Sequence, residues 1–523
     1  MLIEIVLVTS FYTMNAVWWT VCALTLWRPH VDGARILALL LMAARSHWNV
    51  VDAVLQTLVA RGHHVTAVTP FLKKTRPANY TEVDISQLTP SGVSMSWDFI
   101  VDTSSRANNL PYLSGRHRLT CTKLFEHDEF WRVIESQKFD LFITELLASS
   151  CDAYISYRLK APQIVITSSH AHTWYHHTFG SHTNPAHVST FHAPYAVPTN
   201  FVQRMANACD YLYSHVVYKW VDREATAIGR KHFGADAPDA DTLMRNTSLV
   251  FVNGHHTVDL AKPLLPNFVD IGGIHLARPK PLPRDIEQFI DESPNGVIYF
   301  TFGSTIKMET APVHLQKTFV EALAEIPQRV LWKYENRNLK DVPKNVMINN
   351  WFPQRDILEH KNVKLFISHG GMSGIYEAVD SGVPVLGIPL FFDQPHNIAN
   401  IVHWGAGVML DYKTLTKDTL INAIREMINN YDKYKSKAME LSMRFKDRPK
   451  TPKEEVIYWT EYIIKHKGAH HLKSAALKLS WWQYLLIDML IAIVLGLFVI
   501  AYVVFAVFKT MKNQLSKEKK KVF

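Results

Sequence analysis

The stretch over residues 368–394 carries the side chains best suited to hold a phosphorylated ligand. It reads SHGGMSGIYEAVDSGVPVLGIPLFFDQ. An apolar strand is expected to end at Ser368, and His369, Gly370 and Gly371 then open a helix. Glycines let a ligand approach the backbone closely, and the unpaired N–H groups and dipole of a first helical turn favour an anion. The pattern predicts a diphosphate cradle to which His369 adds a donor.

Three polar side chains downstream extend this pattern. Glu377 lies eight residues after His369, about two helical turns along the same side of the helix. A carboxylate there can accept hydrogen bonds from a pair of ribose hydroxyls. Asp393 and Gln394 follow the next expected strand, at the carboxyl edge where open α/β sheets bind ligands. They offer acceptors and donors for the hydroxyls of a sugar.

A histidine in the first half of the chain is a candidate general base. The apolar run Ile36–Met42 is typical of a buried parallel strand, and His47 follows it after a short turn. At the carboxyl end of a strand, His47 would face the second half of the chain. An imidazole titrates near neutral pH and can take a proton from an attacking hydroxyl.

Strands and helices alternate in both halves. Apolar residues at helical spacing over 49–61 predict a helix that Gly62 ends, and Val65–Thr69 predicts the next strand. Further strands are expected at Phe139–Thr144 and Gln163–Thr167. The elements expected in the second half are Val297–Phe302, Val313–Ile326, Arg329–Tyr334, Val363–Ser368, Gly371–Ser381, Pro384–Ile388 and Asp393–His403.

A proline-rich stretch separates the two halves. Pro279, Pro281 and Pro283 stand at every second position, which predicts an extended linker. The predicted fold class is therefore α/β, with two doubly wound domains that face each other across a cleft.

The two ends of the chain indicate a membrane protein. Residues 489–508 carry no charge, and at about 1.5 Å per residue such a helix spans the roughly 30 Å hydrocarbon core of a bilayer. Lysines follow it, which predicts a cytosolic tail over 509–523. The uncharged run Ile5–Trp27 indicates a signal peptide over residues 1–28. The body would then lie on the opposite side of the membrane from the tail.

Charge and cysteine content exclude several classes of protein. The last fifteen residues carry +5 of the formal net charge of +9, so a basic nucleic-acid-binding surface is not indicated. The four cysteines show no CxxC spacing, which excludes a disulfide scaffold and a thiolate zinc site. Once the signal peptide is removed, at most one disulfide can form within the chain, and the sequence does not select it.

Two further short motifs concern processing and location. Asn79 and Asn246 begin Asn-X-Ser/Thr triplets and are predicted glycosylation sites. Lys520 and Lys521, four and three places from the C-terminus, resemble the dilysine retrieval signal of endoplasmic-reticulum membrane proteins.

The stretch over 368–394 closely resembles the signature of the UDP-glycosyltransferase family, in particular its animal membrane-anchored branch, which includes the UDP-glucuronosyltransferases. Residues 391–395, FFDQP, resemble insect members most. The segment GVIYFTFGS (296–304) resembles the family's strand and phosphate turn, WFPQ (351–354) its uracil-contacting motif, and GGIH (272–275) the segment before its linker. The resemblance covers nearly the whole chain, including both ends.

The resemblance implies a two-domain enzyme of the GT-B type. The expected organisation is a signal peptide (1–28), an N-terminal acceptor-binding domain (29–276), a linker (277–292), a C-terminal UDP-sugar-binding domain (293–445), a return and juxtamembrane segment (446–488), a transmembrane helix (489–508) and a cytosolic basic tail (509–523). The residues implied to bind the UDP-sugar are Ser304, Trp351, Gln354, His369, Gly370, Gly371, Ser373, Gly374, Glu377, Asp393 and Gln394.

Each implied contact follows from a motif position. Trp351 would stack on the uracil, while Gln354 and Glu377 would hold polar groups of the uracil and ribose. Ser304 and His369 would contact the diphosphate, and Asp393 and Gln394 the sugar. The signature departs from the family at Ser373 and Gly374, where Asn-Ser or Leu-Ser is usual. The hydroxyl is displaced by one residue there, so the backbone N–H is the expected phosphate donor.

The resemblance also implies an acidic partner for the base. Ser46, His47 and Trp48 resemble the family's catalytic histidine motif. The family's aspartate follows the strand Phe139–Thr144, at the position that Glu145 occupies here, so the partner would be one methylene longer. Asp152, seven residues on, is the alternative. A carboxylate in this role orients the imidazole and stabilises its protonated form.

The predicted activity is transfer of a hexose, with inversion, from a UDP-sugar to hydroxyl groups of small lipophilic acceptors. UDP-glucose is favoured as donor by the likeness to insect members, and UDP-glucuronate is the alternative. The UDP-sugar is a co-substrate, and no cofactor or metal is required. The seven histidines between positions 170 and 192 lack metal-ligand spacing and are expected to line the acceptor region. A homo-oligomer is possible.

Two other classes of function compete with this one. One is a catalytically inactive, membrane-anchored protein that binds lipophilic ligands, and the presence of His47 with a candidate acid argues against it. The other is an NAD-dependent enzyme, which is disfavoured because no GxGxxG follows a strand.

The predicted location is the endoplasmic-reticulum membrane, as a single-pass type I protein with lumenal catalytic domains and a short cytosolic tail.

Overall fold

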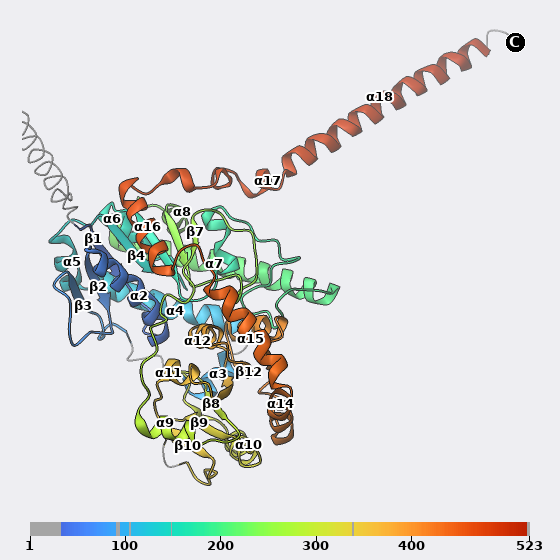
Figure 1. Ribbon diagram of the computed structural model, residues 1–523. Coiled ribbons are helices and arrows are strands. Elements are labelled where there is room, and N and C mark those ends of the chain that lie inside the picture. The colour runs from blue at the N-terminus through green and yellow to red at the C-terminus, as the bar shows by residue number, and fades with distance from the viewer. Residues whose placement is uncertain (1–32, 90–94, 104–105, 148, 337–338, 520–523) are drawn as a thin grey trace, which may run out of the picture.

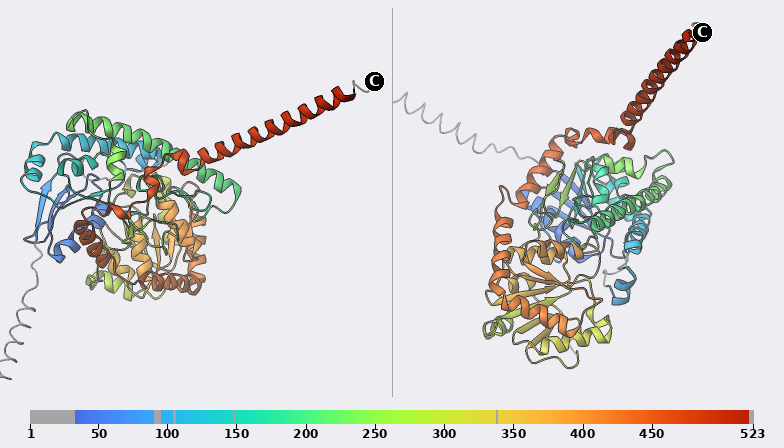
Figure 2. Two further views of the ribbon diagram at one scale, coloured as in Figure 1. Left: turned by 90° about the horizontal axis from the view of Figure 1, so that it is seen from above. Right: turned by 90° about the vertical axis from the view of Figure 1, so that its right-hand side faces the viewer.

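A computed structural model describes residues 33–89, 95–103, 106–147, 149–336 and 339–519 (Figure 1). The expected signal peptide and both lysines of the dilysine motif lie outside these residues. The described chain forms two lobes, and a long C-terminal helix projects away from them in every view (Figures 1 and 2).

The first lobe is built on a seven-stranded sheet in the order β3-β2-β1-β4-β5-β6-β7, with every neighbouring pair parallel. Its strands are β1 (Arg35–Leu39), β2 (His64–Thr69), β3 (Tyr80–Asp84), β4 (Leu141–Glu145), β5 (Gln163–Thr167), β6 (Leu249–Val252) and β7 (Phe268–Asp270). Its helices are α2 (Arg45–Arg61), α4 (Arg106–Phe125), α5 (Asp128–Glu135), α6 (Ala153–Leu159), η1 (Thr173–Tyr175), η2 (His177–Phe179), α7 (Phe201–Phe233) and α8 (Ala240–Arg245). Helix α3 (Trp97–Thr103) comes from the same half of the chain but packs on the second lobe.

The second lobe repeats this plan with a six-stranded parallel sheet in the order β10-β9-β8-β11-β12-β13. Its strands are β8 (Val297–Thr301), β9 (Arg329–Lys333), β10 (Val346–Asn349), β11 (Val363–Ser368), β12 (Val385–Gly387) and β13 (Gly407–Met409). Its helices are α9 (Arg284–Asp291), η3 (Met308–Thr310), α10 (Val313–Ala324), α11 (Gln354–Leu358), α12 (Met372–Ser381), α13 (Gln394–His403), α14 (Lys417–Asn429) and α15 (Tyr431–Lys446).

Both sheets are doubly wound, and this confirms the predicted fold class. The order of strands reverses between β1 and β4 in the first sheet and between β8 and β11 in the second. Strands β4, β5, β6 and β8 are buried at every position because helices cover both faces, which explains why their sequences are mainly apolar. Ligands bind at the carboxyl ends of strands beside such a reversal.

The two lobes are tied together at several points. Met95 pairs with Ile306 in an isolated parallel bridge, and Trp97 and Ile100 pack into the hydrophobic core of the second lobe. The Tyr376 hydroxyl of α12 donates to the backbone carbonyl of Asn253 at 3.1 Å. These contacts fix how the carboxyl edges of the two sheets face each other.

The chain returns to the first lobe after α15. Helix α16 (Pro452–Lys465) packs against α2, and Val456 and Ile463 enter the core of the first sheet. Arg61 pairs with Glu461 at 2.7 Å across this contact. Short helices η4 (His470–Leu472), η5 (Ala475–Lys478) and α17 (Trp481–Tyr484) then lead to α18 (Ile487–Lys519).

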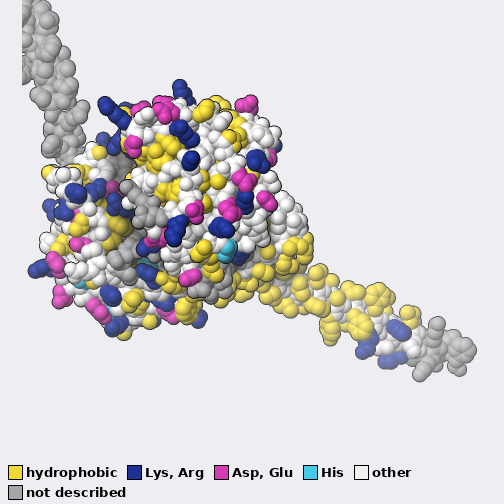
Figure 3. Space-filling model, turned by 90° about the horizontal axis from the view of Figure 1, so that it is seen from below, with side chains coloured by type: hydrophobic (Ala, Val, Ile, Leu, Met, Phe, Trp, Pro, Cys, Tyr) yellow, Lys and Arg dark blue, Asp and Glu magenta, His cyan; other side chains and the backbone are white. Residues whose placement is uncertain are grey.

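Helix α18 is long and apolar enough, over Ile487–Lys517, to cross a membrane; its most apolar 18-residue stretch has a mean hydropathy of 3.1, and none of that stretch is buried. Its apolar surface ends in lysines at the far end (Figure 3). The helix therefore fits a membrane anchor by its length and composition.

Two predicted boundaries differ from the structure. Helix α2 begins at Arg45, so His47 lies in the first turn of a helix and not in a turn before one. The linker predicted over 277–292 is extended only as far as Pro283, because α9 follows and buries Ile286 and Ile290 in the core of the second lobe.

One disulfide joins Cys121 in α4 to Cys151, the residue before Asp152, and Cys209 in α7 is free and exposed. The sequence left this pairing open. The bond attaches α4 to the loop between β4 and α6, next to the carboxyl end of β4.

Candidate active site

A cavity of about 440 Å³ lies between the two lobes, at the carboxyl ends of both sheets. The first lobe contributes His47 and a largely apolar wall. The second lobe contributes the following residues of the predicted site: Ser304, Trp351, Gln354, His369, Gly371, Ser373, Gly374, Glu377, Asp393 and Gln394. Of the other predicted site residues, Gly370, Glu145 and Asp152 do not line the cavity.

His47 is held by a carboxylate behind it. Its Nδ1 lies 2.7 Å from Glu145 Oε1, and its side chain is 27% exposed while that of Glu145 is 4% exposed. A carboxylate only accepts hydrogen bonds, so Nδ1 carries the hydrogen and Nε2 keeps its lone pair. This tautomer is the one that a general base requires.

The electrostatic surroundings of His47 favour its protonated form. Burial lowers the pKa of His47, but the charge and hydrogen bond of Glu145 and the charge of Asp393 outweigh burial and raise it above the ordinary value of 6.5. The positive end of the dipole of α2, where His47 lies, lowers the pKa of His47 as burial does. Asp393 belongs to the second lobe, so its effect shows that the two lobes bring their polar groups close together.

Glu145 has a second partner that the sequence analysis missed. The Ser168 hydroxyl donates to the same oxygen, Oε1, that His47 contacts. Ser168 directly follows β5, so its position at the carboxyl end of an expected strand was an available signal. The neighbouring His117 is buried, and burial lowers its pKa to about 4, so this imidazole stays neutral.

Asp152 faces a different group. Its Oδ2 accepts from the Thr144 hydroxyl, and burial raises its pKa to about 7. Of the two carboxylates considered as partners of His47, the geometry therefore brings Glu145 to the imidazole and directs Asp152 to Thr144.

His369 lies between two glycines of the second lobe. A Cβ atom added to Gly303 or Gly371 would stand 2.7 or 2.5 Å from an atom of the His369 ring. Burial, followed by the charge of Lys333, lowers the pKa of His369 to about 4. The imidazole is therefore neutral, and its Nδ1 has no hydrogen-bond partner.

The N-terminus of α12 opens beside His369. The helix begins at Met372. The preceding Gly371 has no side chain that could cap the first N–H groups. Unpaired N–H groups at such a terminus form an anion site together with the helix dipole. Gly374 lies against Gln354, because an added Cβ would stand 3.2 Å from Gln354 Nε2.

Three polar groups flank this helix. Gln354 Nε2 donates to Glu377 Oε2 at 2.5 Å, and burial raises the pKa of Glu377 to about 7. Trp351 is 64% exposed at the edge of the cavity, so its ring is open to a planar ligand. These side chains can together contact the nucleobase and the ribose of a bound nucleotide.

The last pair lies at the start of α13. Gln394 Oε1 accepts from the backbone N–H groups of Leu390 and Phe391 at 2.9 and 3.2 Å, which leaves its amide hydrogens as donors. Asp393 Oδ2 accepts from Asn397 Nδ2 at 2.8 Å, and burial raises the pKa of Asp393. Both residues face the lobe that carries His47.

Lys333 was also missed by the sequence analysis. It ends β9, lines the cavity and lies 3.4 Å from Glu335. The other basic residue on the cavity wall in the described chain, Arg355, pairs with Glu359 and Asp380. Both cations thus already have carboxylate partners.

The two predicted glycosylation sites differ in their surroundings. Asn246 is exposed at the end of α8. The amide nitrogen of Asn79, in contrast, donates to the carbonyls of Val59 and His63 at 2.9 and 2.8 Å. A sugar on Asn79 would replace one of the two amide hydrogens and so break one of these hydrogen bonds, which favours Asn246 as the modified residue.

Comparison with known proteins agrees with this geometry. Residues 36–522 match the model of the family described as UDP-glucoronosyl and UDP-glucosyl transferase. The chain is 44% identical to UDP-glucosyltransferase 2 of Dactylopius coccus, over 88% of this chain and 89% of that protein. It is 31% identical to UDP-glucuronosyltransferase 2C1 of Oryctolagus cuniculus, over 85% and 92%.

Solved structures support the fold alone. The spinosyn forosaminyltransferase SpnP superposes with a TM-score of 0.53 at 15% identity, over 83% of this chain and 99% of that one. The glycotransferase of kitacinnamycin gives a TM-score of 0.51 at 20% identity, over 82% and 99%. With its GT-B arrangement of two Rossmann-type sheets and its match over nearly the whole length, the chain belongs to the UDP-glycosyltransferase family.

Proposed function

We propose that the protein transfers glucose from UDP-glucose to hydroxyl groups of small lipophilic acceptors, with inversion at the anomeric carbon and His47 as the general base. The observation that carries this proposal is that His47, on the wall of the cavity that also contains Asp393 and the N-terminus of α12, is held from behind by Glu145, with Nδ1 2.7 Å from the carboxylate. Membership of the UDP-glycosyltransferase family supports a UDP-sugar as the donor.

The proposed reaction uses groups of both lobes. The acceptor hydroxyl gives its proton to His47 Nε2 while its oxygen forms a bond to C1 of the sugar. The bond between C1 and the phosphate oxygen breaks, and UDP leaves with the electron pair from the opposite face. The N–H groups that open α12 stabilise the charge on the leaving diphosphate, and such preorganised dipoles are typically worth a few kcal/mol each.

The cavity favours a neutral sugar over a glucuronate. A glucuronate carboxylate needs a cation, and Lys333 and Arg355 are both engaged by carboxylates. Asp393 would also repel a second negative charge close to the sugar. The 44% identity to a protein named UDP-glucosyltransferase supports the same choice.

The first lobe supplies an apolar surface for the acceptor. The side chains that line its part of the cavity include Met42, Leu110, Leu113, Leu147, Trp174 and Phe191. Burial of apolar area is the main source of affinity for a lipophilic ligand.

We further propose an endoplasmic-reticulum location with lumenal lobes, supported by α18 and by the basic tail and dilysine sequence after it.

Assay of the purified full-length protein with UDP-glucose, UDP-glucuronate and a panel of phenols tests the proposed function. We expect faster turnover with UDP-glucose and a β-linked glucoside, identified by its anomeric coupling in NMR. A retained α-linkage would refute inversion. Binding of UDP without transfer to any acceptor would support an inactive binding protein instead.

Removal of the proposed base should separate transfer from nucleotide binding. In His47→Ala we expect the rate of transfer to fall by about 10²–10⁴-fold, the usual contribution of a general base, while the dissociation constant of UDP stays nearly unchanged. His64→Ala is the matched control, since His64 is exposed at the start of β2. Near-normal turnover in His47→Ala would defeat the assignment.

The pH profile should identify the acidic partner. Neutral His47 is the active form, so kcat/KM rises with pH through the pKa of His47. Glu145→Gln removes a group that raises this pKa, so the rise should move to lower pH. The plateau should fall by about a hundredfold or more because the imidazolium loses its partner.

Asp152→Asn serves as the control for this profile, because Asp152 bonds to Thr144 and not to His47. It should leave the midpoint of the rise in place. A shift in Asp152→Asn with none in Glu145→Gln would reverse the assignment of the two carboxylates.

A further inference from the structure

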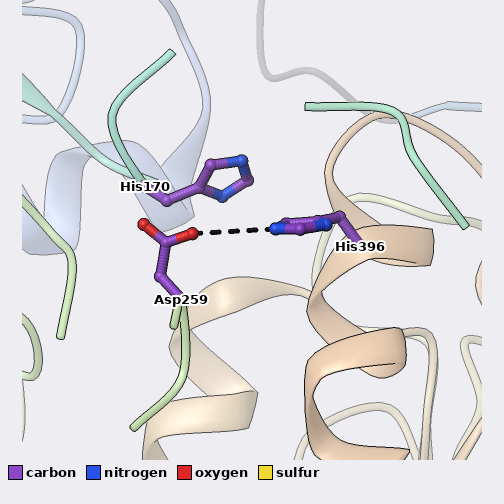
Figure 4. A group of neighbouring side chains, drawn as sticks. All are labelled: His170, Asp259 and His396. Carbon is purple, nitrogen blue, oxygen red and sulfur yellow. Dashed lines mark ion pairs between the residues drawn. The ribbon is translucent and has the colours of Figure 1, made fainter. Parts of the chain in front are cut away.

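A buried cluster of His170, Asp259 and His396 lies between the two lobes (Figure 4). His170 is in the loop after β5 and Asp259 in the loop after β6, while His396 is in the first turn of α13. They are 2%, 7% and 4% exposed. One ligand atom from each residue lies within 4.8 Å of the other two. The proposed transfer reaction uses none of the three.

The hydrogen bond of His396 determines which of its nitrogens faces Asp259. Nδ1 lies 3.3 Å from the backbone carbonyl oxygen of Tyr195, which can only accept, so Nδ1 carries the hydrogen. Nε2 faces Asp259 Oδ1 at 3.7 Å, a contact that is an ion pair when Nε2 also carries a hydrogen. When Nε2 keeps its lone pair, the two atoms are both acceptors and a bound cation can join them. A metal-binding histidine is typically oriented in this way, by a hydrogen bond from its other nitrogen.

The distance favours a metal ion over a proton. At 3.7 Å the two atoms are too far apart for an N–H···O bond, which spans about 2.7–3.2 Å. Nitrogen and oxygen ligands bound at about 2.0–2.2 Å to one tetrahedral zinc ion lie roughly 3.4 Å apart. The observed spacing is close to that of two ligands on a shared ion.

His170 supplies the third ligand. Both of its ring nitrogens are buried and neither has a hydrogen-bond partner. Burying two such polar atoms without a partner is costly. The ring centres of His170 and His396 are 5.0 Å apart, so both imidazoles can turn a nitrogen to one point beside Asp259.

Lys262 already compensates part of the negative charge of Asp259. Its Nζ donates to Asp259 Oδ2, so only Oδ1 remains for a metal. The nearby ammonium opposes a second cation and is expected to weaken binding. Two imidazoles and one carboxylate with an open fourth position are nonetheless a ligand set that Zn²⁺ prefers over Ca²⁺ or Mg²⁺.

We propose that His170, Asp259 and His396 form a zinc site that clamps the two lobes together. This differs from the expectation that the histidines between positions 170 and 192 only line the acceptor region. His396 lies in the same helical turn as Asp393 and Gln394. A bound ion would therefore hold the N-terminus of α13 against the first lobe and fix the distance between the proposed sugar contacts and His47.

Zinc binding by the full-length protein in detergent tests this proposal. After treatment with a chelator and desalting, the protein is titrated with Zn²⁺ against a chromophoric competitor, and its bound metal and melting temperature are measured. We expect one zinc per chain and a higher melting temperature with zinc. His170→Gln and His396→Gln should each lose the bound zinc and the thermal shift, while the exposed control His187→Gln keeps both.

A further variant tests the role of the neighbouring charge. Lys262→Met removes the ammonium beside Asp259 and should tighten zinc binding. The proposal is overturned if the wild-type protein takes up no zinc at micromolar concentrations, or if His170→Gln and His396→Gln bind zinc as the wild type does, which would indicate an adventitious ion only. Neither result depends on whether the protein transfers glucose.

Discussion

The hydrogen bond between His47 and Glu145 depends on the order of strands in the first sheet. The two residues are 98 positions apart, and they meet because β1 and β4 are neighbours where the winding of the sheet reverses. The same reversal between β8 and β11 brings Gly303 against His369. Because the two reversals face each other across one cavity, the base proposed in one lobe and the anion site proposed in the other can act on a single ligand.

The surroundings of the two histidines fit the different roles proposed for them. Glu145 and Asp393 raise the pKa of His47, whereas burial lowers that of His369 to about 4. A raised pKa favours uptake of a proton by the imidazole, as a general base requires, and a histidine that stays neutral can donate a hydrogen bond to a phosphate. Contacts that join the lobes, such as Tyr376 to Asn253 and α16 to α2, keep these two environments in one cavity.

Much of this arrangement was predictable from the sequence, because buried parallel strands read as apolar runs and ligand residues follow their carboxyl ends. The start of α2 at Arg45 was not predicted, since its first turn lacks apolar periodicity. The role of Ser168 and the pairing of Cys121 with Cys151 depend on contacts between distant segments, which no local pattern encodes. The cluster around His396 was missed for the same reason, because its three residues come from both lobes.

The most direct measurement of the central claim is an experimental structure of the full-length protein with UDP and an acceptor bound. The account predicts that the diphosphate contacts the N–H groups at the start of α12. It also predicts that the acceptor hydroxyl lies about 2.6–3.2 Å from His47 Nε2. A diphosphate held elsewhere, or an acceptor whose hydroxyl lies on the side of the cavity away from His47, would contradict it.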